Sequence, residues 1–131
     1  MVPPDNKNTK ISTSKKTDYS SKSLAEIIAN AALEKIGEEI KIFDLAGLTD
    51  MTDYFVIVTG NGNLHVKAIV DHIQDNTVKV SKPWHVEGYE SLKWVLLDYV
   101  DVVVHVFDRT TREYYDIERL WADADISSVS D

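Results

Sequence analysis

The sequence has no cysteine, few prolines and glycines, and no long apolar segment. The lack of cysteine excludes disulfide bonds, thiolate zinc sites and thiol catalysis, and it fits a reducing compartment. No apolar run approaches the roughly 20 residues that a helix needs to cross a bilayer. A chain of 131 residues is long enough for one domain that buries its own core. These observations predict a soluble, single-domain protein, and we expect a cytoplasmic location.

Positive charge is scarce beyond the first residues. Residues 1–22 contain five lysines and two aspartates, whereas the remaining chain has 9 Lys and Arg against 20 Asp and Glu, a formal charge of −11. Such a body is repelled by phosphate, which argues against nucleic acid as the main ligand. It favours a basic protein surface as the partner. The alternative is that the acidity only keeps the protein soluble.

The two ends of the sequence differ in composition from its middle. Residues 1–22 are rich in Lys, Ser, Thr and Asn, which predicts a disordered tail. This segment lacks the apolar core of a secretory signal. It is Ser-rich like a transit peptide but has no arginine, so an organellar location stays open. The predicted domain spans 23–124, and the acidic, Ser-rich residues 125–131 are expected to fray.

Helical and strand patterns alternate within the predicted domain. Two capping-box patterns predict helix starts: Ser23 with Glu26, and Thr110 with Glu113. The elements predicted between them are strands at 40–45 and 54–58, a turn at 60–62, a helix from 63 that ends before 83, and strands at 84–87, 93–98 and 101–107. In the last helix, Tyr114, Ile117 and Trp121 share a face. We expect an α/β fold, with one mixed sheet of about five strands and helices packed on it.

The strands at 93–98 and 101–107 are joined by a very short turn, so they should pair antiparallel. With Tyr99 and Val100 at the turn centre, Trp94 lies opposite His105. Alternation of side chains then gives one wholly aliphatic face, which must be core. The residues of the other face are Trp94, Leu96, Asp98, Asp101, Val103 and His105.

This mixed face has the composition of an interface: an aromatic anchor, aliphatic neighbours and charged residues at its rim. Two carboxylates beside one turn repel each other, and a basic partner residue would relieve this. Two alternatives stay open. The aspartates could instead accept hydrogen bonds from turn amides, and Trp94 could be a core residue under a helix.

Catalytic, phosphate and metal sites are weakly supported. Gly60-Asn61-Gly62 between a strand and a helix invites a phosphate-binding interpretation, but His65 stands where the dinucleotide pattern wants glycine. His65 and His72 are seven residues apart, too far for two ligands of one ion at the usual helical spacing. We therefore predict no catalytic residues, no metal and no cofactor.

Several motifs in order resemble one known family. They are Asp53–Gly60 followed by His65-Val66; Glu87-Gly88 with Trp94–Tyr99 and Asp101–Phe107; and Arg112–Tyr115 with Leu120–Ala124. Together they resemble the ribosomal silencing factor family, also called Iojap-like. The resemblance implies a mixed sheet related to nucleotidyltransferases. It also implies binding to large-subunit ribosomal protein fourteen, which blocks subunit joining and lowers translation when nutrients are scarce. No cofactor is implied, and free members are monomers or dimers.

The resemblance also implies which residues bind the partner. They are Trp94, Leu96, Asp98 and Tyr99, with Asp101 and His105 opposite. The family usually has glycine where this chain has Val100, and valine resists positive φ. The nucleotidyltransferase relation keeps a nucleotide-using enzyme as the alternative function. Against it, Asn61 follows Gly60 where a Gly-Ser turn is needed, and Asp71 falls in a predicted helix instead of a strand with paired acids.

Overall fold

The computed structural model describes residues 20–131. The predicted disordered tail therefore lies almost entirely outside the described residues. The part that is described corrects its boundary, because the first helix already begins at Ser21. Its N-cap is Ser20, whose hydroxyl accepts a hydrogen bond from the Ser23 amide, so the predicted capping box that began at Ser23 is wrong.

A single six-stranded mixed sheet organises the molecule, so the predicted fold class is confirmed with one strand more than expected. The elements in chain order are α1 (Ser21–Glu34), β1 (Glu38–Asp44), β2 (Tyr54–Gly60), α2 (Asn63–Thr77), β3 (His85–Glu87), β4 (Trp94–Asp98), β5 (Val102–Asp108), α3 (Arg109–Tyr115), the 3₁₀ helix η1 (Ile117–Trp121) and β6 (Asp125–Val129). The strands lie in the order β3-β4-β5-β2-β1-β6. β2 and β5 run parallel at the centre, and the four other pairings are antiparallel.

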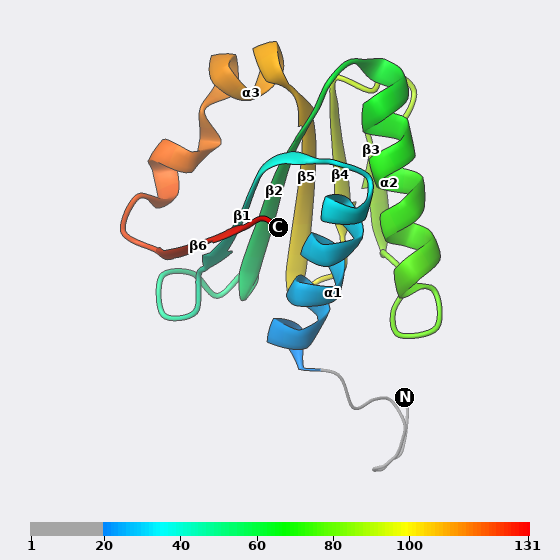
Figure 1. The fold of residues 1–131 in the computed structure, drawn as a ribbon. Helices are drawn as coiled ribbons and strands as arrows, with labels where there is room; N and C mark the ends of the chain where they lie inside the picture. Colours follow the sequence, from blue (N-terminus) through cyan, green and yellow to red (C-terminus); the bar gives the residue numbers. More distant parts are fainter. Residues whose placement is uncertain (1–19) are drawn as a thin grey trace.

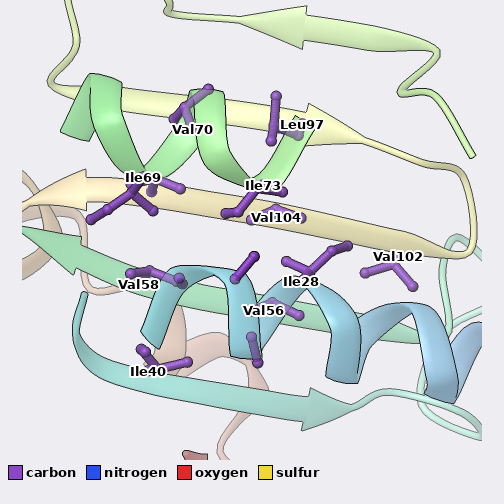
Figure 2. Close-up of a cluster of buried hydrophobic side chains, with 14 of the residues drawn as sticks. Ile28, Ile40, Val56, Val58, Ile69, Val70, Ile73, Leu97, Val102 and Val104 are labelled. Carbon is purple, nitrogen blue, oxygen red and sulfur yellow. The ribbon is translucent and has the colours of Figure 1, made fainter. Parts of the chain in front are cut away.

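Helices α1 and α2 lie together on one face of this sheet (Figure 1). Their apolar stripes, which include Ile28 on α1 and Ile69 and Ile73 on α2, point at the strands (Figure 2). Side chains of the strands, such as Val56 and Val104, pack against these stripes and are fully buried. This larger core uses the aliphatic face that strand alternation predicted for the β4–β5 pair.

Within residues 20–131, the opposite face of the sheet is covered in part, by η1 and the segment that follows it. A smaller core lies there, and its buried members are Phe43, Leu45, Ile57 and Phe107. Ile117 and Trp121 of η1 pack against it. Because η1 covers only one part of this face, the side chains on β4 and the first half of β5 remain within reach of a partner.

The last part of the chain departs from the prediction in two ways. The single final helix is broken, because Asp116 adopts a left-handed conformation with φ 46° that separates α3 from η1. The helix also begins after Asp108, whose carboxylate accepts a hydrogen bond from the Thr111 amide, and not at a Thr110 capping box. The residues expected to fray form β6, which pairs antiparallel with β1.

The predicted antiparallel pairing of β4 and β5 is confirmed, but its register is wrong by two residues. Trp94 lies opposite Phe107, and His105 lies opposite Leu96. Asp98 pairs with Val103, so the two aspartates do not face each other. A shift of two residues keeps every side chain on its predicted face, because side chains alternate with a period of two.

A buried arginine on α3 connects η1 with β1 and β2. Arg112 on α3 is only 5% exposed. Its guanidinium donates to both carboxylate oxygens of Glu118, at 2.8 and 3.1 Å. It also donates to the Glu39 carbonyl and the Thr59 hydroxyl, each at 2.8 Å. Glu39 lies in the bulge of β1 opposite β2 and has φ 47°, so Arg112 secures an irregular strand that has lost part of its ladder.

Candidate functional site

The predicted binding residues fall into two groups in the structure. Trp94, Leu96 and Asp98 are half-buried on the side of the sheet that α1 and α2 do not cover, and Asp101 is exposed in the turn. His105 shares their side but is buried at the floor of this face, with 5% exposure. Tyr99 is buried in the other core and does not lie on this face.

Tyr99 holds the turn to the helical layer. Its phenol hydroxyl lies 2.8 Å from the Thr77 hydroxyl at the end of α2. Burial raises the pKa of the Tyr99 phenol above its usual value. The side chain therefore has a structural place in the larger core.

The turn itself is strained. Val100 has φ 76°, a left-handed conformation that disfavours β-branched residues, and its side chain is 47% exposed. The Asp98 carboxylate accepts a hydrogen bond from the Val100 amide at 2.8 Å, so one alternative from the sequence, an aspartate that bonds a turn amide, holds for Asp98. The backbone at Val100 therefore has a conformation that glycine adopts readily and valine does not.

Trp94 and His105 form a hydrogen-bonded pair across β4 and β5. The indole Nε1–H of Trp94 donates to Nδ1 of His105 at 3.0 Å. Because an indole can only donate, Nδ1 must be the acceptor, and a neutral His105 carries its proton on Nε2. Burial lowers the pKa of His105 from 6.5 to about 4, so the ring is neutral at physiological pH.

Aromatic rings surround this pair and fix its orientation. Trp94 packs against Phe107 and Tyr115, with ring centroids 4.8 and 5.0 Å apart. The His105 ring meets Phe55 edge to face at 4.6 Å. Gly88 allows the preceding loop to approach, since a Cβ there would lie 2.0 Å from the Trp94 carbonyl oxygen.

A pocket of about 360 Å³ opens on this face next to the pair. Its lining residues are Thr49, Met51, Thr52, Phe55, Leu96, Asp98, Val100, Val103, His105 and Trp121. Six of these ten residues are apolar, and the polar ones are two threonines, one aspartate and one histidine. Such a combination of apolar walls and few polar groups is typical of a binding site.

A second hollow, of about 440 Å³, lies on the helical side between α1 and β6. Charged side chains line it, among them Lys22, Glu26 and Asp44. It is larger, but it includes none of the predicted binding residues, and none of its described lining residues has a buried side-chain polar atom without a partner. We therefore take the smaller, apolar pocket beside Trp94 as the candidate functional site.

The structure also shows where the residues of the weaker phosphate, metal and nucleotide sites considered from the sequence lie. Gly60 lies against Val66 so closely that a Cβ would be 2.7 Å from its methyl group, and Gly62 has φ 97°, which supports turn geometry as the role of these glycines. Asp71 lies within α2 and accepts hydrogen bonds from Lys67 and Tyr89. Within residues 20–131, no three His, Asp or Glu side chains are placed to hold a metal ion. None of the helices in that range is long and apolar enough to cross a membrane.

The sequence did not single out several residues of the pocket, notably Phe55, Trp121, Met51 and Thr52. Phe55 lies opposite Val103 in the parallel β2–β5 pair. The face of the sheet on which Phe55 lies could be assigned only from that pairing, because the sequence of β2 is an apolar run without alternation. Trp121 reaches the pocket because Asp116 breaks the last helix, and no sequence pattern predicted that break.

The chain is similar to known proteins of one family. A family model described as "Ribosomal silencing factor during starvation" matches residues 18–131. The chain therefore belongs to the ribosomal silencing factor family. Among curated relatives, the ribosomal silencing factor RsfS of Bacillus subtilis is 40% identical over 112 residues, which cover 82% of this chain and 92% of that protein. RsfS of Chromobacterium violaceum is 41% identical over 99 residues, covering 72% of this chain and 79% of that protein.

Solved structures agree with this family membership. A crystal structure of a Chromobacterium violaceum protein superposes with a TM-score of 0.77 at 33% identity, covering 79% of this chain and 88% of that one. Organellar proteins are also similar: chloroplastic Iojap of Zea mays is 30% identical over 78% of this chain, which covers 45% of the maize protein. The family assignment and the mixed-sheet fold predicted from the motifs are confirmed. The relation to nucleotidyltransferases stays a prediction.

Proposed function

We propose that this ribosomal silencing factor binds the large ribosomal subunit through ribosomal protein fourteen and sterically blocks joining of the small subunit. In this proposal it acts in the cytoplasm of its cell and represses translation when nutrients are limiting. It needs no cofactor and performs no catalysis. The observation that carries the proposal is the open sheet face around Trp94, Leu96 and Asp98, with its apolar pocket.

The chemistry of this face suits a basic protein partner. The half-buried Trp94 gives an aromatic anchor that Phe107 and Tyr115 hold in one orientation, and anchors of this kind dominate binding energy at interfaces. Asp98 at the pocket and Asp101 in the turn place negative charge beside the apolar surface. The formal charge of −8 on the whole chain adds long-range attraction to a basic surface.

Among the described residues 20–131, the two long helices leave this face uncovered, and only short elements lie over part of it. Helices α1 and α2 cover the other side, and η1 covers only the part over the smaller core. A partner can therefore dock on β4 and β5 without displacing a helix. We propose that free molecules use the same face to form a homodimer, because its apolar surface includes Val100 at 47% and Met51 at 84% exposure.

The test uses purified large subunits and a substitution in the middle of the face. Leu96→Arg introduces a cation into the pocket wall and is expected to abolish co-sedimentation with large subunits and inhibition of subunit joining. Leu64→Arg is the matched control, because Leu64 is 82% exposed on α2, away from the face. The control should bind and inhibit as the unmodified protein does. Leu96→Arg should also keep the molecular mass independent of concentration.

The proposal fails if the unmodified protein stays in the supernatant at low-micromolar concentration with large subunits. It also fails if subunits join at the same rate with and without it. Equal activity of Leu96→Arg and Leu64→Arg, with both variants folded by circular dichroism, would move the interface to another part of the molecule.

A further inference from the structure

The pocket contains one buried donor that has no acceptor. Nε2 of His105 is inaccessible to solvent and has no hydrogen-bond partner. The Trp94 indole occupies Nδ1, so the proton of the neutral ring is on Nε2. A buried donor without an acceptor is unfavourable, and buried polar groups in folded proteins are nearly always paired. Such a donor beside a pocket is a position where an acceptor from a bound partner would be favourable.

The surroundings of this donor restrict what the acceptor can be. Asp98 lines the same pocket, so an anionic group would be repelled. The rest of the lining is mainly apolar, which suits an aliphatic or aromatic side chain. Met51 lines the pocket and is 84% exposed, so its unbranched side chain can move aside when a group enters.

We infer that the pocket receives one apolar side chain from a basic loop of the partner protein, and that His105 Nε2–H donates to a carbonyl oxygen of that loop. Asp98 then pairs with a cationic residue of the loop at the pocket rim. The donor is unpaired before binding and paired after it, so this bond favours the complex over the free state more than an exposed bond would. His105 thus acts as a specificity-determining residue for a neutral acceptor. The inference rests on the proposed function, because it names how the same face recognises its partner.

Two substitutions of His105 separate this role from that of holding Trp94. His105→Gln places an amide donor near the position of Nε2 and loses the acceptor for Trp94. His105→Asn places its amide near the position of Nδ1 and loses the donor at Nε2. We expect Asn to weaken binding to large subunits about tenfold or more, and Gln to weaken it less. If His105 only holds Trp94, the order reverses, and that result overturns the inference.

The pocket and its rim are tested in the same sedimentation titration, with the full chain and isolated large subunits. Val103→Phe, which fills the pocket from β5, should weaken binding at least tenfold. Asp98→Asn keeps an acceptor for the Val100 amide but loses the charge, so it should weaken binding and make it less sensitive to salt. Asp75→Asn on α2 is the matched charge control and should bind as the unmodified protein does.

The outcomes separate the two proposals. If the unmodified protein binds and Val103→Phe and His105→Asn bind within about twofold of it, the pocket inference is overturned while the proposed function stands. If the unmodified protein does not bind large subunits, the proposed function fails, and the inference fails with it. Thermal unfolding of each variant shows that it is folded at the assay temperature.

Discussion

Replacing Arg112 by methionine should destabilise the protein strongly, although the residue lies far from the candidate site. The substitution keeps an unbranched side chain of similar length but removes every donor of the guanidinium. The Glu118 carboxylate loses a bidentate hydrogen-bond donor. The Glu39 carbonyl and the buried Thr59 hydroxyl each lose one hydrogen-bond donor. Removing one member of a buried ion pair costs about 3–5 kcal/mol, because the other charge is left without a partner.

The lower end of this range applies, because the Glu118 side chain is 24% exposed to water and Lys41 Nζ lies 3.9 Å from its carboxylate as a second cation. We therefore expect a loss of about 3 kcal/mol in the free energy of unfolding by urea, and a fall of about 10 °C in Tm. Arg119→Met is the control: the Arg119 side chain is 83% exposed in its pair with Asp116, so the loss should stay within about 0.5 kcal/mol.

A second variant tests the cause. Combining Arg112→Met with Glu118→Leu removes both charges and should recover part of the lost stability, since no half-buried carboxylate is then left without its arginine. A loss below about 1 kcal/mol for Arg112→Met alone, with an unchanged urea dependence, would refute the view of Arg112 as the clamp of the β1 bulge.

Two further predictions concern the strand pair. Burial lowers the pKa of His105 to about 4 from its ordinary 6.5, so the unfolded chain takes up this proton first as pH falls. The contribution of the neutral His105 to the free energy of unfolding is fully present above pH 6.5 and is lost as pH falls towards 4, by about 3 kcal/mol in all. Chemical unfolding measured from pH 7 to pH 4 should show this loss in the unmodified protein and lack it in His105→Gln. Parallel pH profiles for the two proteins would contradict the prediction. Val100→Gly should raise the free energy of unfolding by about 0.5–1 kcal/mol, because glycine accepts φ 76° without strain although the unfolded chain gains freedom. Val100→Ala keeps the positive φ and serves as the control; a Val100→Gly variant less stable than the alanine variant would show that the turn is not strained.

The sequence was most informative where side-chain periodicity alone decides the structure. Alternation along β4 and β5 separated the core face from the open face, and this separation survived a register error of two residues. The error arose at Val100, where a positive φ that valine disfavours lengthens the turn. The site prediction had a different weakness, since Tyr99 was taken as a binding residue from the family resemblance, and its ring in fact enters the larger core.

The failures came where long-range contacts override local composition. Residues 125–131 are acidic and polar, and they form β6 only because the edge of β1 offers backbone partners. Asp116 takes a left-handed conformation within a helical pattern, and its position lets Glu118 reach Arg112. Neither effect leaves a local pattern. The pocket likewise combines β2, β4, β5 and η1, so its residues could not be collected without the pairing of β2 with β5.

The parallel pairing at the centre of the sheet also has a consequence for synthesis of the chain. Tyr54 pairs with Val102, so β2 is synthesised 48 residues before the strand with which it pairs. During this interval β1 and β2 can pair, but the other edge of β2 carries unpaired amides and carbonyls on one of the most apolar stretches of the chain. At typical elongation rates the wait lasts from about 2 to about 10 seconds. An incomplete chain that ends before β5 is therefore prone to edge-to-edge aggregation. Once residues 102–108 have been synthesised, β5 can pair with this edge of β2, and the edge is no longer open to other chains.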